Sequence, residues 1–299
     1  MAKDNDATND SIWLYTPSTA LAIVVATLYL IPTSLLFYQT ILKYRSWFFL
    51  CVLIGSCLEV GGYIARAVST KQVTEIPPFA ASSTLIILAP IFVAAGNYLL
   101  IGRLIRVVLP PPSASATATA STSSAKRIFG LRAQHITRIF VGCDVLSCLI
   151  QASGSGIASS GNWTGNSAKV GTDVLIAGLS TQVGTFVWFL AIVWRFSVLT
   201  KRGGLVVDGA PEGWLKVLWA IYASSALILV RCVYRVIEFA LGIDGYPFTH
   251  EWVFYVFESL PMLPAISVFC VYHPARYLGK AGWLQKQVSE EPGVELLPA

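Results

Sequence analysis

The chain has 299 residues, of which 55% are hydrophobic and 12% are charged, and its formal net charge at pH 7 is +5. A soluble domain carries about 25% charged residues, so this chain has too few charges to cover the surface of a water-soluble globule. The composition argues against a cytosolic enzyme and against a nucleic-acid-binding protein. It also excludes intrinsic disorder for most of the chain, because disorder requires low hydrophobicity and high charge.

Seven stretches of the chain are long and apolar enough to cross a bilayer, which takes about 20 residues per helix. We predict an all-α, seven-helix membrane domain over residues 19–278, with an extracellular polar tail at 1–18 and a cytosolic tail at 279–299. Residues 110–132, which contain Pro-Pro-Pro and a Ser/Ala/Thr run, are expected to form a flexible cytosolic loop. The spans are predicted near residues 19–38, 47–67, 80–101, 136–158, 173–194, 214–240 and 251–272.

The positions of the basic residues predict the orientation of this domain. With the N-terminus outside, 15 of the 21 lysines and arginines fall in the inner loops and the inner tail, as the positive-inside rule requires. The tail before the first span is acidic and lacks a basic segment, so we do not expect a cleaved signal peptide. The glycosylation sequons at Asn9 and Asn162 both fall outside in this orientation, which agrees with it and predicts a glycoprotein.

Charged side chains inside the spans are the main functional signal, because a charge at the centre of a bilayer costs about 2.5–3.5 kcal/mol. The second span carries Glu59 and Arg66 two helical turns apart, on one face of the helix. The sixth span carries Arg231, Arg235 and Glu238 on one face, where the last two can touch. The fourth, fifth and seventh spans add Gln151, Gln182 and Glu258. Four prolines inside spans are expected to kink their helices: Pro32, Pro90, Pro261 and Pro264.

The acids and arginines of this set balance in charge and fall in the outer half of the membrane. From them we infer a polar, hydrated cavity that opens outward and binds a substrate. A second, smaller polar cluster is predicted toward the cytosol, formed by Asn97, Arg103 and Asp144. Two structural alternatives stay open. Arg66, Arg235 and Glu238 lie near a helix end and can extend to the interface, and the deeper residues can form a purely structural ion-pair network.

The sequence carries no motif for catalysis or for a cofactor. A P-loop, a His-Glu-x-x-His zinc motif and a Gly-x-Ser-x-Gly nucleophile motif are all absent. The three histidines lie at or near membrane boundaries, so no pair within the membrane can ligate a haem, and the six cysteines show no metal-ligand spacing. We therefore expect a protein that is not an enzyme and that holds no metal and no cofactor.

Six of the spans carry short motifs in a fixed order. They are Leu58–Arg66, Leu88–Pro90 with Gly102-Arg103, Asp144-Val145 with Gln151, Gly178-Leu179 with Gln182, Arg231 with Tyr234-Arg235 and Glu238, and Glu251, Tyr255 and His273-Pro274. Over roughly residues 35 to 278, this set resembles the fungal lipid-translocating exporter family of the aminocholesterol-resistance type. Two positions depart from the pattern, since Glu258 stands where we expect aspartate and Ala275 where we expect glycine.

The resemblance implies a seven-helix fungal protein of the plasma membrane. It implies export or outward translocation of lipids and resistance to amphiphilic toxic compounds, which makes membrane lipids or amphiphilic small molecules the expected partners. Nucleic acid is not an expected partner, and the sequence does not define an oligomeric state. The alternative function is that of a seven-helix lipid sensor or receptor-like regulator. The topology fits a receptor, although the Asp-Arg-Tyr triplet that receptors carry after the third span is absent.

Overall fold

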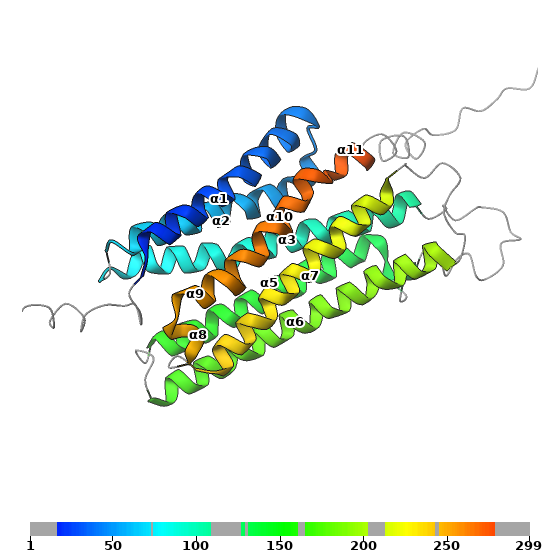
Figure 1. The fold of residues 1–299 in the computed structure, drawn as a ribbon. Helices are drawn as coiled ribbons and strands as arrows, with labels where there is room; N and C mark the ends of the chain where they lie inside the picture. The colour runs from blue at the N-terminus through cyan, green and yellow to red at the C-terminus, as the bar shows by residue number, and fades with distance from the viewer. Residues whose placement is uncertain are drawn as a thin grey trace, which may run out of the picture.

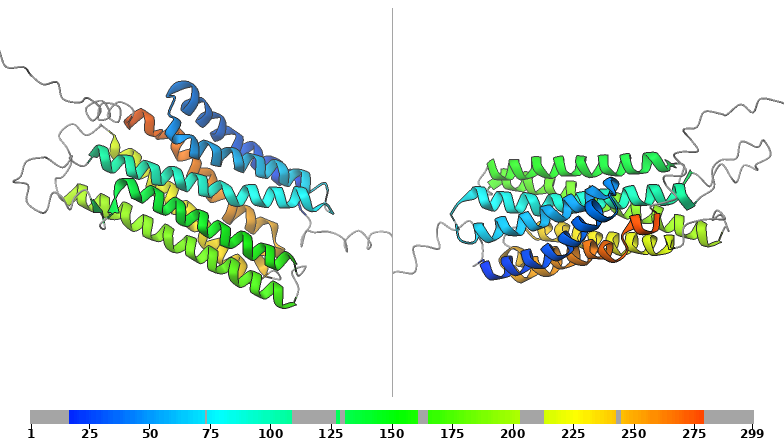
Figure 2. Two further views of the ribbon diagram at one scale, coloured as in Figure 1. Left: turned by 180° about the vertical axis from the view of Figure 1, so that it is seen from behind. Right: turned by 90° about the horizontal axis from the view of Figure 1, so that it is seen from above.

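The computed structural model describes residues 17–72, 74–108, 127–128, 131–160, 165–202, 213–242 and 245–278. These residues contain seven helical spans that are long and apolar enough to cross a membrane, so the predicted all-α membrane bundle is confirmed. The spans lie side by side in one elongated bundle (Figure 1; seen from behind and from above in Figure 2). We call the end where the first helix begins the Thr19 end, and the other end the Leu278 end.

Single helices form most of the spans, and turns of other helical types interrupt three of them. The spans consist of α1 (Thr19–Phe37) with the π-helical turn η1 (Tyr38–Lys43), the 3-10 turn η2 (Trp47–Phe49) with α2 (Leu50–Ser69), α3 (Ile76–Val108), α5 (Ala133–Ser160), α6 (Gly165–Arg202), α7 (Trp214–Ala240), and α9 (Glu251–Phe254) with the π-helical turn η3 (Tyr255–Ser259) and α10 (Leu260–Val271). The smaller elements are the antiparallel strands β1 (Arg127–Ile128) and β2 (Leu131–Arg132) and the short helices α8 (Tyr246–Thr249) and α11 (Pro274–Leu278).

Several helices are longer than the apolar stretches that predicted them. α3 has 33 residues and α6 has 38, against predicted spans of 80–101 and 173–194. The reason is that hydropathy marks only the part of a helix inside the hydrocarbon, whereas backbone hydrogen bonding continues into the headgroup region. Most of the expected loop at 110–132 lies outside the described residues, but its last part includes the β1–β2 hairpin.

The seventh span is the most irregular, and its prolines explain why. Pro261 and Pro264 lack a backbone N–H and cannot donate to the preceding turn. The π-helical turn η3 ends at Ser259, two residues before Pro261, and π-helical turns are frequent at functional sites. The turn carries Glu258, so the irregular backbone positions one of the charges that the sequence singled out.

The bundle consists of two closely packed helix pairs joined by α7 and the seventh span. α2 lies along α3 and α5 lies along α6, while α7 contacts α3, α6 and α10 (Figures 1 and 2). Buried aromatic rings fill the space between α3, α5 and α6, with the centroids of Tyr98 and Phe189 4.6 Å apart and those of Phe140 and Phe189 5.6 Å apart. Large apolar side chains are exposed on the outside of the bundle, where lipid solvates them.

Glycines set the close approach of α5 and α6. A Cβ atom on Gly154 would lie 2.7 Å from the backbone nitrogen of Leu175 and 2.8 Å from the carbonyl oxygen of Gly171. Both contacts are to backbone atoms, which cannot rotate away. Small residues at helix interfaces allow this kind of contact in membranes. Gly156, two residues further along α5, has open space at the same position.

We therefore predict that Gly154→Ala forces the two helices apart and lowers the stability of the bundle by about 1–3 kcal/mol, the usual cost of overpacking. Thermal unfolding of the purified protein in detergent measures this effect. Gly156→Ala is the matched control and should leave the unfolding temperature unchanged or raise it slightly. Equal unfolding temperatures for the two variants would contradict this account of the α5–α6 contact.

Candidate functional site

Five of the predicted charged residues meet where α2, α7 and η3 come together, and we call them the ionic centre: Glu59, Arg231, Arg235, Glu238 and Glu258. Arg231 of α7 is bound from two sides, with Nη1 3.3 Å from Glu59 Oε1 and Nη2 2.7 Å from Glu258 Oε1. Arg235, one turn further along α7, places Nη1 2.8 Å from Glu238 Oε2 and Nε 3.7 Å from Glu258 Oε2. These contacts join three spans through one network of charges.

The pair at the core of the ionic centre, Glu59 and Arg231, lies deep in the bundle. Glu59 stands ten residues before the end of α2, and Arg231 stands nine residues before the end of α7. At a rise of about 1.5 Å per residue, both lie roughly 14 Å from the Thr19 end of their helices, which is about half of a 30 Å hydrocarbon core. At this depth water cannot solvate the charges unless a cavity admits it, so they must pair.

The sequence predicts an open, hydrated cavity around these charges, but in the structure the charges are buried and the site is closed. Glu59 and Glu258 expose 1% of their surface and Arg231 exposes 3%, so solvent does not reach these charges in this conformation. Where packed helices exclude water, a buried charge is tolerated only beside an opposite charge or a hydrogen-bond partner, and these side chains provide one another with both. The charges that were expected to line a cavity fill the centre of the bundle instead.

A third partner of Arg231 is a backbone carbonyl group that a proline leaves free. Pro90 in α3 has no N–H, so the carbonyl group of Ile86, four residues earlier, lacks its usual helical donor. Arg231 Nη2 donates a hydrogen bond to this oxygen at 2.8 Å. The guanidinium thereby connects α3 to the ionic centre, because Pro90 leaves the carbonyl oxygen of Ile86 free to accept this hydrogen bond.

Hydroxyl groups that were not among the predicted site residues extend the polar region toward α1. Tyr63 donates a hydrogen bond to Ser259 Oγ, and Tyr29 donates one to the Ser259 carbonyl oxygen at 2.6 Å. The two tyrosine rings stack with their centroids 5.3 Å apart. Ser259 follows Glu258 in η3, so hydroxyl groups from α1 and α2 hold the turn that carries this carboxylate. The spacing of Tyr63, one helical turn after Glu59, could have identified this residue from the sequence.

Arg66 shares a face of α2 with Glu59, as its spacing predicts, but it contacts aromatic rings. Its guanidinium lies 4.0 Å from the centre of the Phe254 ring, and its Nε donates to the Tyr255 hydroxyl at 3.3 Å. Arg66 and Glu238 are both buried inside the bundle, so neither extends to the membrane surface. Stacking on aromatic faces is a common way to bury a guanidinium.

The expected inner cluster of Asn97, Arg103 and Asp144 does not form one group. Asp144 Oδ2 accepts a hydrogen bond from the Tyr98 hydroxyl at 2.8 Å, whereas Asn97 donates to two serine hydroxyls of α7 at 3.1 and 3.3 Å. Arg103 is exposed, and its guanidinium lies 3.8 Å from the centre of the Phe48 ring. The reason is helical geometry, since Asn97 and its neighbour Tyr98 point in directions about 100° apart and therefore meet different helices.

The remaining predicted residues lie apart from the ionic centre or outside the described part of the chain. Gln151 of α5 donates to Gln182 of α6 at 3.0 Å, and no hydrogen bond or ion pair in the described ranges connects this pair to the ionic centre. Asn9 and Asn162, the predicted glycosylation sites, are outside the described residues. Among the described residues, no group of three or more His, Cys, Asp or Glu side chains is placed to hold a metal ion.

Seven apolar spans packed around buried, paired charges define a multi-pass membrane protein. The model of the RTA1-like protein family matches residues 52–281, and the chain belongs to this family. The family resemblance inferred from the motifs is therefore confirmed.

Named yeast proteins are similar to this chain over most of its length. In Saccharomyces cerevisiae, protoporphyrin uptake protein 1 is 30% identical over 89% of this chain and 93% of its own length, and protein RTM1 is 29% identical over 91% and 94%. The sphingoid long-chain base transporter RSB1 is 28% identical over 78% of this chain and 66% of its own length. No solved structure gives a significant match.

The ion pairs predict the effect of removing Arg231. We expect Arg231→Gln to lower the free energy of unfolding by about 3–5 kcal/mol, because it leaves two buried carboxylates without their cation. Adding Glu258→Gln should recover part of this loss, since it removes one of the uncompensated charges. Thermal unfolding in detergent of the single and double variants measures the coupling, with the exposed Arg106→Gln as control. A double variant no more stable than Arg231→Gln alone would contradict the pairing.

Proposed function

We propose that this protein is a membrane transporter that exports lipids or amphiphilic toxic compounds, and that the ionic centre is where the polar headgroup of the substrate passes. Two observations support this proposal. The chain is similar to a protein named as a sphingoid long-chain base transporter and to one named for protoporphyrin uptake. The bundle also places paired charges at mid-depth, where a headgroup crossing between leaflets needs charged partners.

The chemistry of passage is an exchange of partners. A cationic amphiphile would pair with Glu59 or Glu258 in place of Arg231, and a phosphate or carboxylate would pair with Arg231 or Arg235. Glu59 supports the first route, because its Oε2 atom is buried and has no hydrogen-bond partner among the described residues. When a cationic headgroup pairs with Glu59, Arg231 keeps Glu258 as its partner, so the displaced guanidinium is not left without an anion.

In this proposal the outward-facing cavity exists in a second conformation of the bundle. Separation of α2 from α7 would expose the ionic centre, and the irregular turn η3 provides the backbone that can move. Arg66, at the Thr19 side of the ionic centre, would then receive a headgroup first, and the Gln151–Gln182 pair would border the path. We further propose an N-terminus outside the cell, residence in the plasma membrane, glycosylation at Asn9 and Asn162, and export as the direction.

A second function, that of a lipid sensor or receptor-like regulator, is favoured by one observation. Four of the five residues of the ionic centre are buried, all but Arg235, and a closed charge network of this kind can serve as a two-state element that a bound lipid shifts without passing through. The two functions differ in whether lipid crosses the membrane in the presence of the purified protein alone.

Transport in liposomes tests the proposal directly. We predict that purified protein in phosphatidylcholine liposomes moves a sphingoid base with a fluorescent nitrobenzoxadiazole group on its chain, as measured by quenching of the label with external dithionite. Glu59→Gln should slow this movement about tenfold or more, since a hydrogen bond to a charged group contributes about 1.5–3 kcal/mol. Glu75→Gln, an exposed acid at the start of α3, is the matched control and should move the probe as the wild type does.

The same assay, carried out with and without a pH gradient, separates the two functions and tests whether the gradient drives movement of the probe. Movement no faster than in protein-free liposomes, with or without a pH gradient, would contradict transport and favour the sensor. Equal rates for wild type and Glu59→Gln, at equal protein incorporation, would contradict the assignment of the headgroup site while leaving transport standing.

A further inference from the structure

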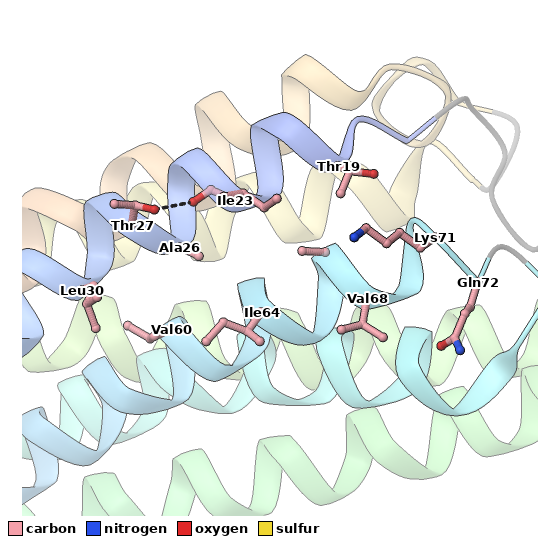
Figure 3. A pocket seen from close by; sticks show the side chains of 11 residues that line it. Thr19, Ile23, Ala26, Thr27, Leu30, Val60, Ile64, Val68, Lys71 and Gln72 are labelled. Atoms are coloured by element: carbon pink, nitrogen blue, oxygen red, sulfur yellow. Dashed lines mark hydrogen bonds between the residues drawn. The ribbon is translucent and has the colours of Figure 1, made fainter.

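An apolar groove on the outside of the bundle, between α1 and α2, lies apart from the ionic centre. It has a volume of about 480 Å³ and runs from Thr19 and Lys71 at the Thr19 end to Leu30 and Val60 (Figure 3). This volume is within the range of about 300–1,000 Å³ found for small-molecule sites. Because the groove lies on the outer face of a membrane bundle, the molecules that reach it come from the lipid.

The length of the groove matches the depth of one leaflet. Thr19 and Leu30 are 11 residues apart in α1, which at about 1.5 Å per residue gives a groove of about 16 Å. This is half of the roughly 30 Å hydrocarbon core. A single acyl chain that hangs from the headgroup layer at the Thr19 end would therefore fit along it.

Away from the mouth, where Thr19, Lys71 and Gln72 lie, the walls of the groove carry no polar group that needs a partner from the lipid. Ile23, Leu30 and Ile64 are about half exposed and present their side chains outward. Thr27 also lines the groove, but its hydroxyl donates to the carbonyl oxygen of Ile23 at 2.8 Å (Figure 3), so the residue adds only apolar surface. The chemistry of the walls selects an alkyl chain.

The mouth of the groove carries a cation. Lys71 is exposed and makes no ion pair with any described residue. Figure 3 shows its side chain extending back from the end of α2 toward the start of α1, over the groove. Glu251 accepts the Ser18 amide through both carboxylate oxygens, at 2.9 and 3.1 Å, and no ion pair joins it to Lys71. The charge at the mouth is thus complementary to an anion at headgroup depth.

We infer that the α1–α2 groove binds one glycerophospholipid molecule of the surrounding leaflet, with an acyl chain along the groove and the phosphate against Lys71. The occupant differs from a sphingoid base, whose amine Lys71 would repel, so this is a site for a bilayer phospholipid beside the transport path. The inference does not depend on the proposed function, since a lipid can occupy the groove whether or not the ionic centre passes a substrate.

Native mass spectrometry of the full-length protein in detergent tests the site with two probes that differ only in the phosphate, dipalmitoyl phosphatidic acid and dipalmitoyl glycerol. We expect the wild type to bind one phosphatidic acid about fivefold more tightly than the diacylglycerol, the effect expected of one lysine near an anionic lipid. Lys71→Glu should abolish this preference. Lys216→Glu, an exposed lysine at the Leu278 end, is the matched control and should keep it.

A second variant tests the groove itself. Ala67→Trp fills the groove from α2 and should remove binding of both probes, whereas Ala226→Trp, on an exposed face of α7, should not. If Ala67→Trp fails to fold, Ala26→Trp fills the groove from α1 instead. Equal binding of both probes by the wild type, or unchanged preference in Lys71→Glu, would overturn the phosphate assignment. Unchanged lipid binding in a folded groove-filling variant would overturn the site. If the wild type binds phosphatidic acid in the groove but moves no sphingoid base in the liposome assay, only the proposed function is refuted.

Discussion

A guanidinium in the middle of an apolar bundle must have partners, and Arg231 finds them on three other elements. Two carboxylates and one carbonyl oxygen surround it, from α2, η3 and α3. Leaving any of these charges unpaired at this depth would cost several kcal/mol. The positions of α2, α3, α7 and the seventh span are therefore coupled, because each must keep its polar group within reach of the same side chain.

This constraint accounts for irregular features elsewhere in the bundle. Pro90 interrupts the hydrogen bonds of α3 at the turn where the carbonyl group of Ile86 is needed. The π-helical turn before Pro261 brings Glu258 to Arg231, and the hydroxyls of Tyr29 and Tyr63 hold that turn through Ser259. The α5–α6 pair has its own close contact through glycine, outside this network. A transport cycle that opens the bundle would have to break the ion pairs, and the charge on a substrate would compensate for the loss.

The sequence could predict the number of spans and the residues of the ionic centre, and the reason is the same for both. A bilayer requires about 20 apolar residues per helix, and it admits so few charges that each one inside a span is informative. Glu59, Arg231 and Glu258 stood out on these grounds alone. The family motifs also pointed to these spans, and the family model confirmed the resemblance.

The pairing and the closure could not be predicted, because both depend on how neighbouring helices rotate against each other. Arg66 and Glu59 share a helix face, yet the first meets aromatic rings and the second meets Arg231. Asn97 and Asp144 fall at similar depth but turn toward different helices. The sequence left a hydrated cavity and a structural ion-pair network as alternatives, and only the packing of the helices decides between them. The carbonyl group freed by Pro90 could have been predicted, since a proline inside a helix lacks the N–H that would donate to the carbonyl oxygen four residues before it.

Pulsed electron paramagnetic resonance between spin labels at Gln72, beyond the end of α2, and Leu241, at the end of α7, measures most directly whether Arg231 holds these helices together. The account predicts one narrow distance distribution in the wild-type protein. In Arg231→Gln it predicts a broader distribution with longer distances, because the two carboxylates lose the cation that draws the helices together. The same narrow distribution in both proteins would contradict the claim that this side chain fixes the arrangement of the bundle.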